Sequence, residues 1–346
     1  MAVIQTSGQP VLSVVVPCYN SADYMDHCLE TLLVGAEDVE IIVVDDGSTR
    51  DNTAAKADAW AERHPDTIRV IHQENKGHGG AVMAGLRAAR GVYLFELDSD
   101  DWVDRDAFSL LLTTLRRLVG SGRPVDLMIA NYVYEHTYSG TRRVMKFGGA
   151  LPKNRPFTWD DIGRFAVDQK IAMHSLIYRT QVVRDSGLEL PEHLFYVDNL
   201  YAYVPLPYVK TAYYLPVDLY RYFIGRDDQS VNADVFLGRI DQQYRITSMM
   251  IDAVKLPEGA GNPKLAAYMA GYLSMIVAIS AALAVRDGSP AALERRRAMW
   301  EHIEATDPGL RARLGWLPRV ASLPGRWGRW IVLVLWRYAR RVYRFN

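Results

Sequence analysis

The sequence predicts an α/β protein, with a mostly parallel β-sheet flanked by helices and a helical extension at the carboxyl end. Short apolar segments alternate with helix-like segments from residue 12 to residue 134, as in sheets that carry helices on both faces. A polar cluster also follows each of the first four apolar segments. The extension is expected because 346 residues exceed the size at which one hydrophobic core usually stops growing.

The predicted strands are short apolar runs. Leu12–Val16 ends at Pro17 and has the composition of a buried strand. Further strands are expected at Val39–Val44, Ile68–Ile71, Val92–Leu97 and Leu127–Tyr134. After the last of these, Ser139-Gly140 is typical of a hairpin turn.

Helices are predicted between these strands. Ser21 can cap a first helix, on which Tyr24, Cys28, Leu29 and Leu32 share one face. The other helices are expected at residues 51–63, which are rich in alanine, at residues 79–90, which are mostly small, and at Asp106–Val119.

The composition is that of a folded protein from a reducing compartment. Hydrophobic residues make up 49% and charged residues 23% of the chain, which excludes a disordered protein. The two cysteines, Cys18 and Cys28, exclude a disulfide scaffold. The amino terminus lacks a basic start followed by an apolar run, so no signal peptide is expected.

Four polar clusters are expected to meet at one edge of the sheet. They are Tyr19-Asn20, Asp45-Asp46, Asn75-Lys76-Gly77 and Asp98-Ser99-Asp100. Each follows the carboxyl end of a predicted strand, and ligands of such sheets bind outside those ends. The sequence therefore predicts a ligand site there.

Each cluster has a possible ligand-binding role and a structural role as its alternative. Asp98 and the acidic residues after it suit Mg²⁺ or Mn²⁺, or they cap the helix that follows. Asp45 and Asp46 suit base N–H groups or ribose hydroxyls, or they form a tight turn. Tyr19 can stack on a nucleobase, or it is an ordinary aromatic residue at a strand boundary.

The glycine-rich loop Asn75–Gly80 excludes two familiar enzyme classes. A glycine loop before a helix can cradle phosphate. However, Val82 stands where the dinucleotide pattern needs glycine, and Leu86-Arg87 stands where the P-loop needs Lys-Ser/Thr. These departures argue against a nicotinamide oxidoreductase and a P-loop kinase or ATPase.

With these motifs assembled, the chain resembles the family 2 glycosyltransferases, which have the GT-A fold. The resemblance covers about the first 105 residues, through Ser13–Asn20, Ile41–Ser48, Glu74–Gly77, Ala81–Gly91 and Tyr93–Asp101. The second half is similar to one bacterial branch at Phe195–Asp198, Leu219–Tyr222 and Gln229–Val231. Val197 stands where that branch usually has glutamate.

The resemblance implies roles for particular residues. The nucleotide of a sugar donor would be bound by Pro17, Tyr19, Asn20, Asp45, Asp46, Lys76, Gly77, Asp98 and Ser99. Asp98 and Asp100 would hold Mn²⁺ or Mg²⁺. Asp198 would be the general base, with a plain helix N-cap as its alternative.

Five further residues are candidates on weaker grounds. Trp102 and His174 would contact the acceptor, or they are respectively a packing residue and a hydrogen-bonded core histidine. Arg221, Arg226 and Gln229 would close over the diphosphate, or Arg226 belongs to a solvated charge cluster.

The expected activity is metal-dependent, inverting transfer of a sugar to a hydroxyl of a lipid-linked or polymeric cell-surface glycan. A UDP-sugar is the expected donor. The metal would stabilise the leaving diphosphate, and a carboxylate would deprotonate the acceptor. One alternative is a polyprenyl-phosphate sugar synthase. Another is a non-catalytic subunit of a membrane glycan complex that binds nucleotide-sugar.

The carboxyl-terminal segment is basic and aromatic. Residues 311–346 contain nine arginines, no acidic residue, and Trp316, Trp327, Trp330 and Trp336. On a helix over residues 326–344, the arginines fall within about 120°, and Trp327, Ile331, Val332 and Leu335 face away from them, whereas Trp330 and Leu333 lie on the arginine side. This pattern favours a helix that lies on an anionic membrane, which would place the protein at the cytoplasmic face of the cell membrane.

This segment has two other interpretations. The helix could pack on the protein with its arginines in water. Nucleic acid is disfavoured as a partner because the rest of the chain is acidic.

The uncharged segment Leu265–Val285 is long enough to cross a bilayer. Its alanine, glycine and serine content favours a buried helix instead.

The expected divisions are a catalytic domain at 1–232, with a nucleotide-sugar half at 1–110 and an acceptor half at 111–232. A helical region at 233–310 and the basic tail at 311–346 follow.

Overall fold

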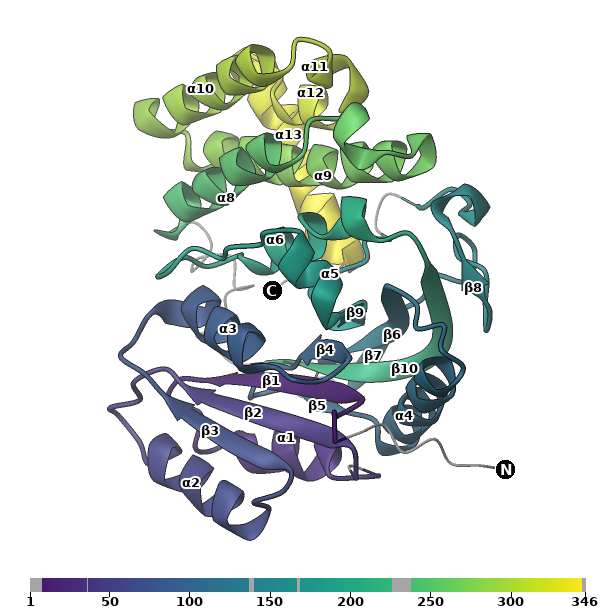
Figure 1. Cartoon of the computed structure of the whole chain (residues 1–346). Coiled ribbons are helices and arrows are strands. Elements are labelled where there is room, and N and C mark those ends of the chain that lie inside the picture. Colours follow the sequence, from purple (N-terminus) through teal and green to yellow (C-terminus); the bar gives the residue numbers. More distant parts are fainter. Residues whose placement is uncertain (1–7, 36, 137–139, 167–168, 226–237, 344–346) are drawn as a thin grey trace. The chain divides into compact units, whose positions relative to one another are not determined.

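A computed structural model describes residues 8–35, 37–136, 140–166, 169–225 and 238–343 (Figure 1). The chain divides into two compact units, Met1–Gly225 and Arg226–Asn346. The first unit contains the β-sheet and the second consists of helices.

The sheet of the first unit begins with the expected parallel half. β1 (Leu12–Cys18) pairs in parallel with β2 (Val39–Asp45) and with β4 (Tyr93–Glu96), and β2 pairs in parallel with β3 (Ile68–His72). Every residue of β1, β2 and β4 is buried. The apolar runs of the sequence therefore became the centre of the sheet.

The other half makes the sheet mixed rather than mostly parallel. β9 (Leu176–Arg179) lies antiparallel between β4 and β6 (Leu127–His136), and β10 (Ala212–Ile224) runs parallel to β6. The remaining strands, β5 (Trp102–Val103), β7 (Thr141–Met145) and β8 (Pro156–Phe157), are antiparallel to their neighbours. β6 and β7 form the expected hairpin, although residues 137–139 of its turn lie outside the described residues.

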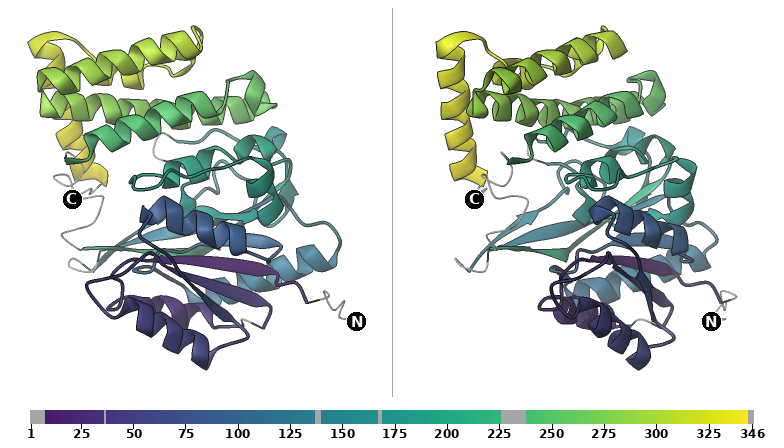
Figure 2. Two further views of the ribbon diagram at one scale, coloured as in Figure 1. Left: turned by 60° about the vertical axis from the view of Figure 1, so that its left-hand side comes forward. Right: turned by 90° about the vertical axis from the view of Figure 1, so that its left-hand side faces the viewer.

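Helices cover both faces of the sheet, as predicted. α3 (Gly77–Ala88) lies on one face, and α1 (Met25–Leu32) and α2 (Thr53–Arg63) lie on the other (Figure 2). α4 (Arg105–Gly120), α5 (Thr180–Asp185) and α6 (Asp198–Tyr203) complete the longer elements of this unit. The small residues of α3 allow close packing, because a Cβ at Gly85 would lie 2.2 Å from Val15 Cγ1 of β1.

Ser21 does not cap the first helix. α1 begins four residues later, at Met25, after a turn in which the N–H groups of Tyr24 and Met25 donate to the Ser21 carbonyl. The Ser21 hydroxyl instead accepts hydrogen bonds from the Tyr19 N–H and the Ser99 hydroxyl. Ser21 therefore joins the loops that follow β1 and β4.

The second unit is a helical bundle around α9 (Pro263–Asp287). α9 contacts α8 (Ile240–Ala253), α10 (Pro290–Thr306), α12 (Leu317–Ala321) and α13 (Gly325–Tyr343), and α11 (Leu310–Arg313) contacts α10. Within the described part of the chain, α9 is the one helix long and apolar enough to cross a membrane by length and composition. Its most apolar 18-residue window is 83% buried inside the protein, which favours the buried-helix interpretation.

Candidate active site

The loops after β1, β2 and β3 are tied together at the carboxyl edge of the sheet. The backbone N–H of Asn20 donates to Ser48 Oγ (2.9 Å), and Asn20 Oδ1 accepts from the backbone N–H groups of Thr49 (3.2 Å) and Arg50 (3.0 Å). Asn20 has a φ of 51°. Its side-chain oxygen therefore shapes the loop after β2, within the predicted nucleotide site.

The two aspartates after β2 also hold loops in place. Asp46 is buried, and its Oδ1 accepts from the Lys76 backbone N–H (2.8 Å) and from Gln73 Nε2 (2.7 Å). Asp45 Oδ1 accepts from the Ser48 N–H (3.1 Å), and its Oδ2 lies 3.1 Å from His72 Nδ1. The hydrogen bond from the Ser48 N–H to Asp45 is the kind expected of a tight turn, which was the structural alternative for this residue.

Four other predicted nucleotide residues belong to the same edge. Pro17 is buried within β1, whereas the Tyr19 ring that follows is 46% exposed and offers a planar surface to solvent. Gly77 has a φ of 73°, and a Cβ there would lie 2.9 Å from the His193 backbone, so the position requires glycine. Lys76 Nζ lies 3.2 Å from Glu192 Oε1.

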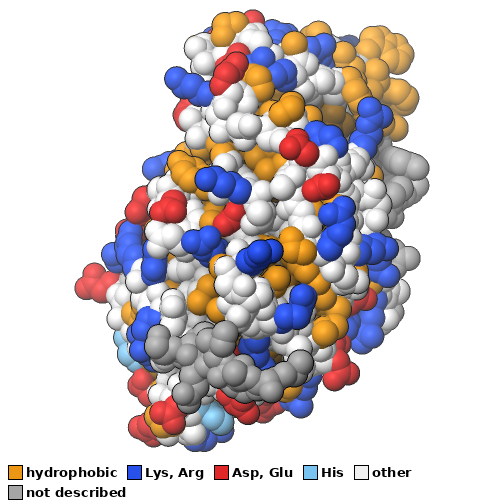
Figure 3. All heavy atoms as spheres, turned by 45° about the vertical axis from the view of Figure 1, so that its right-hand side comes forward, with side chains coloured by type: hydrophobic (Ala, Val, Ile, Leu, Met, Phe, Trp, Pro, Cys, Tyr) orange, Lys and Arg blue, Asp and Glu red, His pale blue; other side chains and the backbone are white. Residues whose placement is uncertain are grey.

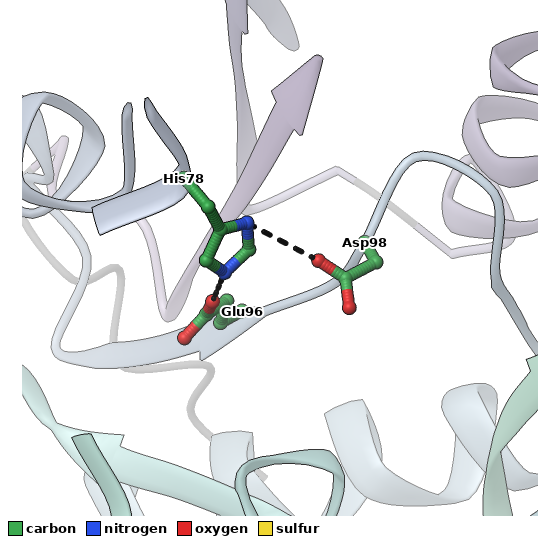
Figure 4. A group of neighbouring side chains, drawn as sticks. All are labelled: His78, Glu96 and Asp98. Atoms are coloured by element: carbon green, nitrogen blue, oxygen red, sulfur yellow. Dashed lines mark hydrogen bonds and ion pairs between the residues drawn. The ribbon is translucent and has the colours of Figure 1, made fainter. Parts of the chain in front are cut away.

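The centre of the site is a histidine between two carboxylates (Figure 4). His78, in the first turn of α3, places Nε2 3.0 Å from Glu96 Oε1 and Nδ1 3.7 Å from Asp98 Oδ1. Glu96 ends β4 and is buried, and its Oε2 has no hydrogen-bond partner. Three ligand atoms from His78, Glu96 and Asp98 lie within 4.8 Å of one another, so this group could hold a metal ion.

The charges of this group act on one another. Burial lowers the pKa of His78, but the hydrogen bond to Glu96 and the nearby carboxylates outweigh burial and raise that pKa to about 9. Burial raises the pKa of Asp98 to about 7, although the charge of His78 lowers it. His78 is therefore charged at neutral pH in the absence of ligand.

Asp98 also belongs to a second group, with Asp101 and His174, whose ligand atoms again lie within 4.8 Å of one another. Asp101 is buried, and it accepts hydrogen bonds from the Tyr220 hydroxyl (2.6 Å) and the Phe223 N–H (2.7 Å) of β10. Asp100 belongs to neither group within the described residues. Of the two predicted metal ligands, Asp98 and Asp100, the structure thus places Asp98 in both groups.

His174 lies among tyrosine rings beside Asp98. Its ring centroid is 5.2 Å from that of Tyr132 and 4.7 Å from those of Tyr220 and Tyr222. Burial, together with the charge of His78, lowers the pKa of His174 to about 3, so the imidazole is neutral. Its Nδ1 is buried without a partner, so this histidine is not the fully hydrogen-bonded core residue of the alternative reading.

Asp198 begins α6, as expected, and its charge interacts with those of His78 and Glu96. Burial raises the pKa of Asp198 to about 6, against the effect of His78. Asn199 Nδ2 donates to Asp198 Oδ1 (3.3 Å). The N-cap itself is Val197.

The remaining predicted residues have structural contacts. Ser99 is buried and donates to Ser21 (2.8 Å). Trp102 packs beside His27, with ring centroids 5.1 Å apart. Arg221 is held by Asp104 (2.7 Å) and Glu135 (2.8 Å). Arg226 and Gln229 lie outside the described residues.

Sequence reasoning missed His78 and Glu96 as site residues. A signal for Glu96 was present, because a charged residue interrupts the apolar run of β4 two positions before Asp98. Nothing local pointed to His78, whose role depends on the packing of α3 against the sheet.

Comparison with known sequences finds one family whose profile matches part of the first unit. The profile of glycosyl transferase family 2 matches residues 13–166. Over 132 residues the chain is 38% identical to the putative glycosyltransferase EpsH of Bacillus subtilis, a match that covers 38% of this chain and 36% of EpsH. It is 39% identical over 126 residues to the glycosyltransferase GlyG of Streptococcus pneumoniae, covering 35% of this chain and 39% of GlyG. The chain thus spans well under two thirds of these relatives.

Solved structures share the fold at low sequence identity. Residues 1–349 of TarS from S. aureus superpose with a TM-score of 0.59 at 18% identity, covering 90% of each chain. The mannosyltransferase PcManGT from Pyrobaculum calidifontis superposes with a TM-score of 0.51 at 19% identity, covering 95% of this chain and 88% of the other. The fold is of the GT-A type expected from the motifs, and residues 13–166 are similar to glycosyl transferase family 2.

Proposed function

We propose that the protein is a glycosyltransferase that moves a sugar from a nucleoside-diphosphate donor, a UDP-sugar in the first instance, to a hydroxyl group. The observation that carries this proposal is the contact of Asp98 with His78, whose charge also acts on the half-buried Asp198, at the sheet edge that holds the loops of Tyr19 and Asp46. The family similarity over residues 13–166 supports it. TarS has been solved with UDP-GlcNAc, and PcManGT with GDP-Man and Mn²⁺.

The donor set near Asp98 suits a divalent metal such as Mn²⁺ or Mg²⁺. Asp98 offers a carboxylate, and His174 offers a neutral imidazole whose Nδ1 has no partner. Carboxylates suit both ions, and an imidazole ligand would favour the transition metal. Asp100 would be the further ligand implied by its position in the motif. The metal would neutralise charge that develops on the leaving diphosphate.

Asp198 is proposed as the general base. A sugar hydroxyl must lose its proton as it attacks, and a carboxylate with a raised pKa is suited to accept it. The pKa of about 6 leaves Asp198 ionised at neutral pH. One displacement at the anomeric carbon would invert its configuration.

The acceptor is proposed to be a lipid-linked or polymeric cell-surface glycan, met at the cytoplasmic face of the membrane. The relatives include glycosyltransferases and a chondroitin synthase from bacteria, and residues 311–346 are basic and aromatic. The proposed catalytic domain is 1–232, with its nucleotide-sugar half at 1–110 and its acceptor half at 111–232. A helical region at 233–310 would follow, and the tail at 311–346 would serve membrane attachment.

Calorimetric titration with UDP, GDP, CDP and dTDP, each with Mn²⁺ and then with chelator, tests the donor site. One nucleotide should bind in the presence of metal, and Asp98→Asn should weaken that binding at least tenfold. Asp185→Asn, an exposed change at the end of α5, is the matched control. Absence of binding by all four nucleotides, with and without metal, would overturn the proposal.

A further inference from the structure

Helix α13 has one face packed on its own unit. Val332 is 3% exposed and packs with Ala282 and Val285 of α9, and Trp336 packs against the same cluster. The guanidinium of Arg329 lies beside Gly288, at the end of α9. This packing fixes which side of α13 is turned away from α9.

The opposite side of α13 presents large apolar side chains to solvent. Trp327 is 81% exposed, Trp330 60% and Val334 39%. At about 100° per residue, Trp327, Trp330 and Val334 lie within about 60° of one another, and Val332 lies about 140–160° away from each of them. Trp316, just before α12, is 65% exposed. We call Trp327, Trp330 and Val334 the tryptophan face.

This arrangement corrects the partition expected from the sequence. Val332 was expected beside Trp327 on the lipid side, whereas the expected position of Trp330 beside the arginines agrees with the helical wheel. In the structure, Val332 is buried and both tryptophans are exposed. The sequence pattern could not decide this, because the choice depends on which side chains α9 accommodates.

The charged residues of the segment that carries the tryptophan face are all basic. Arg326 and Arg337 are exposed and, on the same helical wheel, lie next to Trp330. Neither forms an ion pair within the part of the chain that the structure describes. No acidic residue occurs between Arg311 and Asn346. Figure 3 shows hydrophobic side chains gathered at one edge of the helical unit, near side chains of lysine and arginine.

We propose that the tryptophan face, with Arg326 and Arg337 beside it, is the surface through which this chain binds an anionic lipid bilayer. Tryptophan is suited to the boundary between headgroups and acyl chains, and arginine pairs with lipid phosphates. A helix held on one side by α9 would lie in the plane of the membrane and insert only its outer side chains. The inference rests on the membrane association proposed above and not on glycosyl transfer.

A bilayer suits this surface better than a second protein. Protein interfaces pair arginine with carboxylates and close around their apolar centre. Here the apolar side chains form a stripe along about two turns of α13, from Trp327 to Val334, within a segment that supplies no carboxylate of its own. A second copy would bring the same positive charge against itself, whereas an anionic bilayer provides both an apolar layer and negative charge.

Co-sedimentation of the full chain with vesicles tests the inference. The chain should bind phosphatidylcholine vesicles that contain about one third phosphatidylglycerol, and bind pure phosphatidylcholine vesicles at least about tenfold more weakly. The double change Trp327→Ser and Trp330→Ser should weaken binding to the anionic vesicles at least about tenfold. Arg326→Gln with Arg337→Gln should weaken it about tenfold or more, because each arginine near such a surface contributes about a fivefold factor.

Leu293→Ser is the matched control, because Leu293 is 38% exposed on α10 of the same unit but lies off the tryptophan face. It should leave vesicle binding unchanged. All variants should keep the unfolding temperature of the parent, because the changed side chains are exposed.

Three results would overturn the inference. They are failure of the parent chain to bind anionic vesicles, equal binding by the tryptophan variant, and a dimer in sedimentation velocity that the same tryptophan changes abolish. Nucleotide titration of the same samples separates the proposals. A chain that binds nucleotide with Mn²⁺ but no vesicle refutes the lipid surface alone, and the converse result refutes the donor site alone.

Discussion

At the scale of the residue, the site depends on a buried charge with a single partner. Glu96 is 2% exposed, and its one hydrogen bond is to His78 at 3.0 Å. A buried carboxylate costs several kcal/mol when no opposite charge accompanies it. The imidazole of His78 therefore supports Glu96 and, through the contact at 3.7 Å, also orients Asp98.

Replacing His78 should consequently destabilise the protein more than replacing a histidine at the surface. We expect His78→Ala to lower the free energy of unfolding by about 3 kcal/mol, measured by urea denaturation. His72→Ala is the control. His72 also contacts two carboxylates, but it is 45% exposed and one of them, Asp45, keeps its bond from Ser48, so a loss below about 1 kcal/mol is expected.

Repeating the His78→Ala change in a Glu96→Leu protein separates the loss of the charge interaction from the loss of side-chain packing. In a Glu96→Leu protein no buried carboxylate remains, so His78→Ala should there cost at least about 1 kcal/mol less than in the parent. Equal costs in the two backgrounds would contradict the interpretation that His78 stabilises the charge of Glu96.

At the scale of the element, α3 lies close to the sheet because its residues are small. Helix 79–90 was predicted, and the structure has Gly77–Ala88. The closest approach is at Gly85, against the Val15 side chain of β1. The lysine, glycine and histidine at the start of α3 reach the active site from this position.

Adding one methyl group at Gly85 should therefore push α3 from the sheet. We expect Gly85→Ala to lower the free energy of unfolding by about 1–3 kcal/mol through overpacking, and Val15→Ala in that background to recover part of the loss. Gly120→Ala is the control, since nothing lies within 4 Å of its Cβ position at the end of α4. It should be neutral or slightly stabilising. Equal effects at both glycines would mean that α3 adjusts freely.

The length and composition of each strand explain whether it could be predicted from the sequence. Strands β1 to β4 are mostly apolar, and each matches its predicted position within two residues. β9 has four residues and β5 has two, too few for a periodic pattern, and each exists only through its neighbours in the sheet. β10 is interrupted by a register shift between Leu215 and Asp218, so the sequence indicated only its Tyr-rich end at Leu219–Tyr222.

At the scale of the whole molecule, the candidate site joins residues that are far apart in the chain. The motifs before residue 101 predicted the convergence at the sheet edge, since parallel strands place their carboxyl ends together. The position of His174 among tyrosines of β6 and β10 could not be predicted, because it depends on pairings made after residue 127. Residues 146–225 therefore decide much of the chemistry around Asp98.

The choice between a hydroxyl and a phosphate acceptor is decided by whether Asp198 must accept a proton. A hydroxyl needs the base, whereas a lipid phosphate is already ionised. For transfer to a hydroxyl, we expect Asp198→Asn to lower kcat at least about 100-fold and to leave the binding of UDP with Mn²⁺ unchanged.

Because burial raises the pKa of Asp198 to about 6, the base is protonated and inactive at lower pH. The rate of the parent enzyme should thus fall about tenfold per pH unit below that value, as a profile of kcat/KM against pH would measure. A flat profile between about pH 5 and pH 7, with full activity in Asp198→Asn, would contradict the role of Asp198 and favour a polyprenyl-phosphate acceptor.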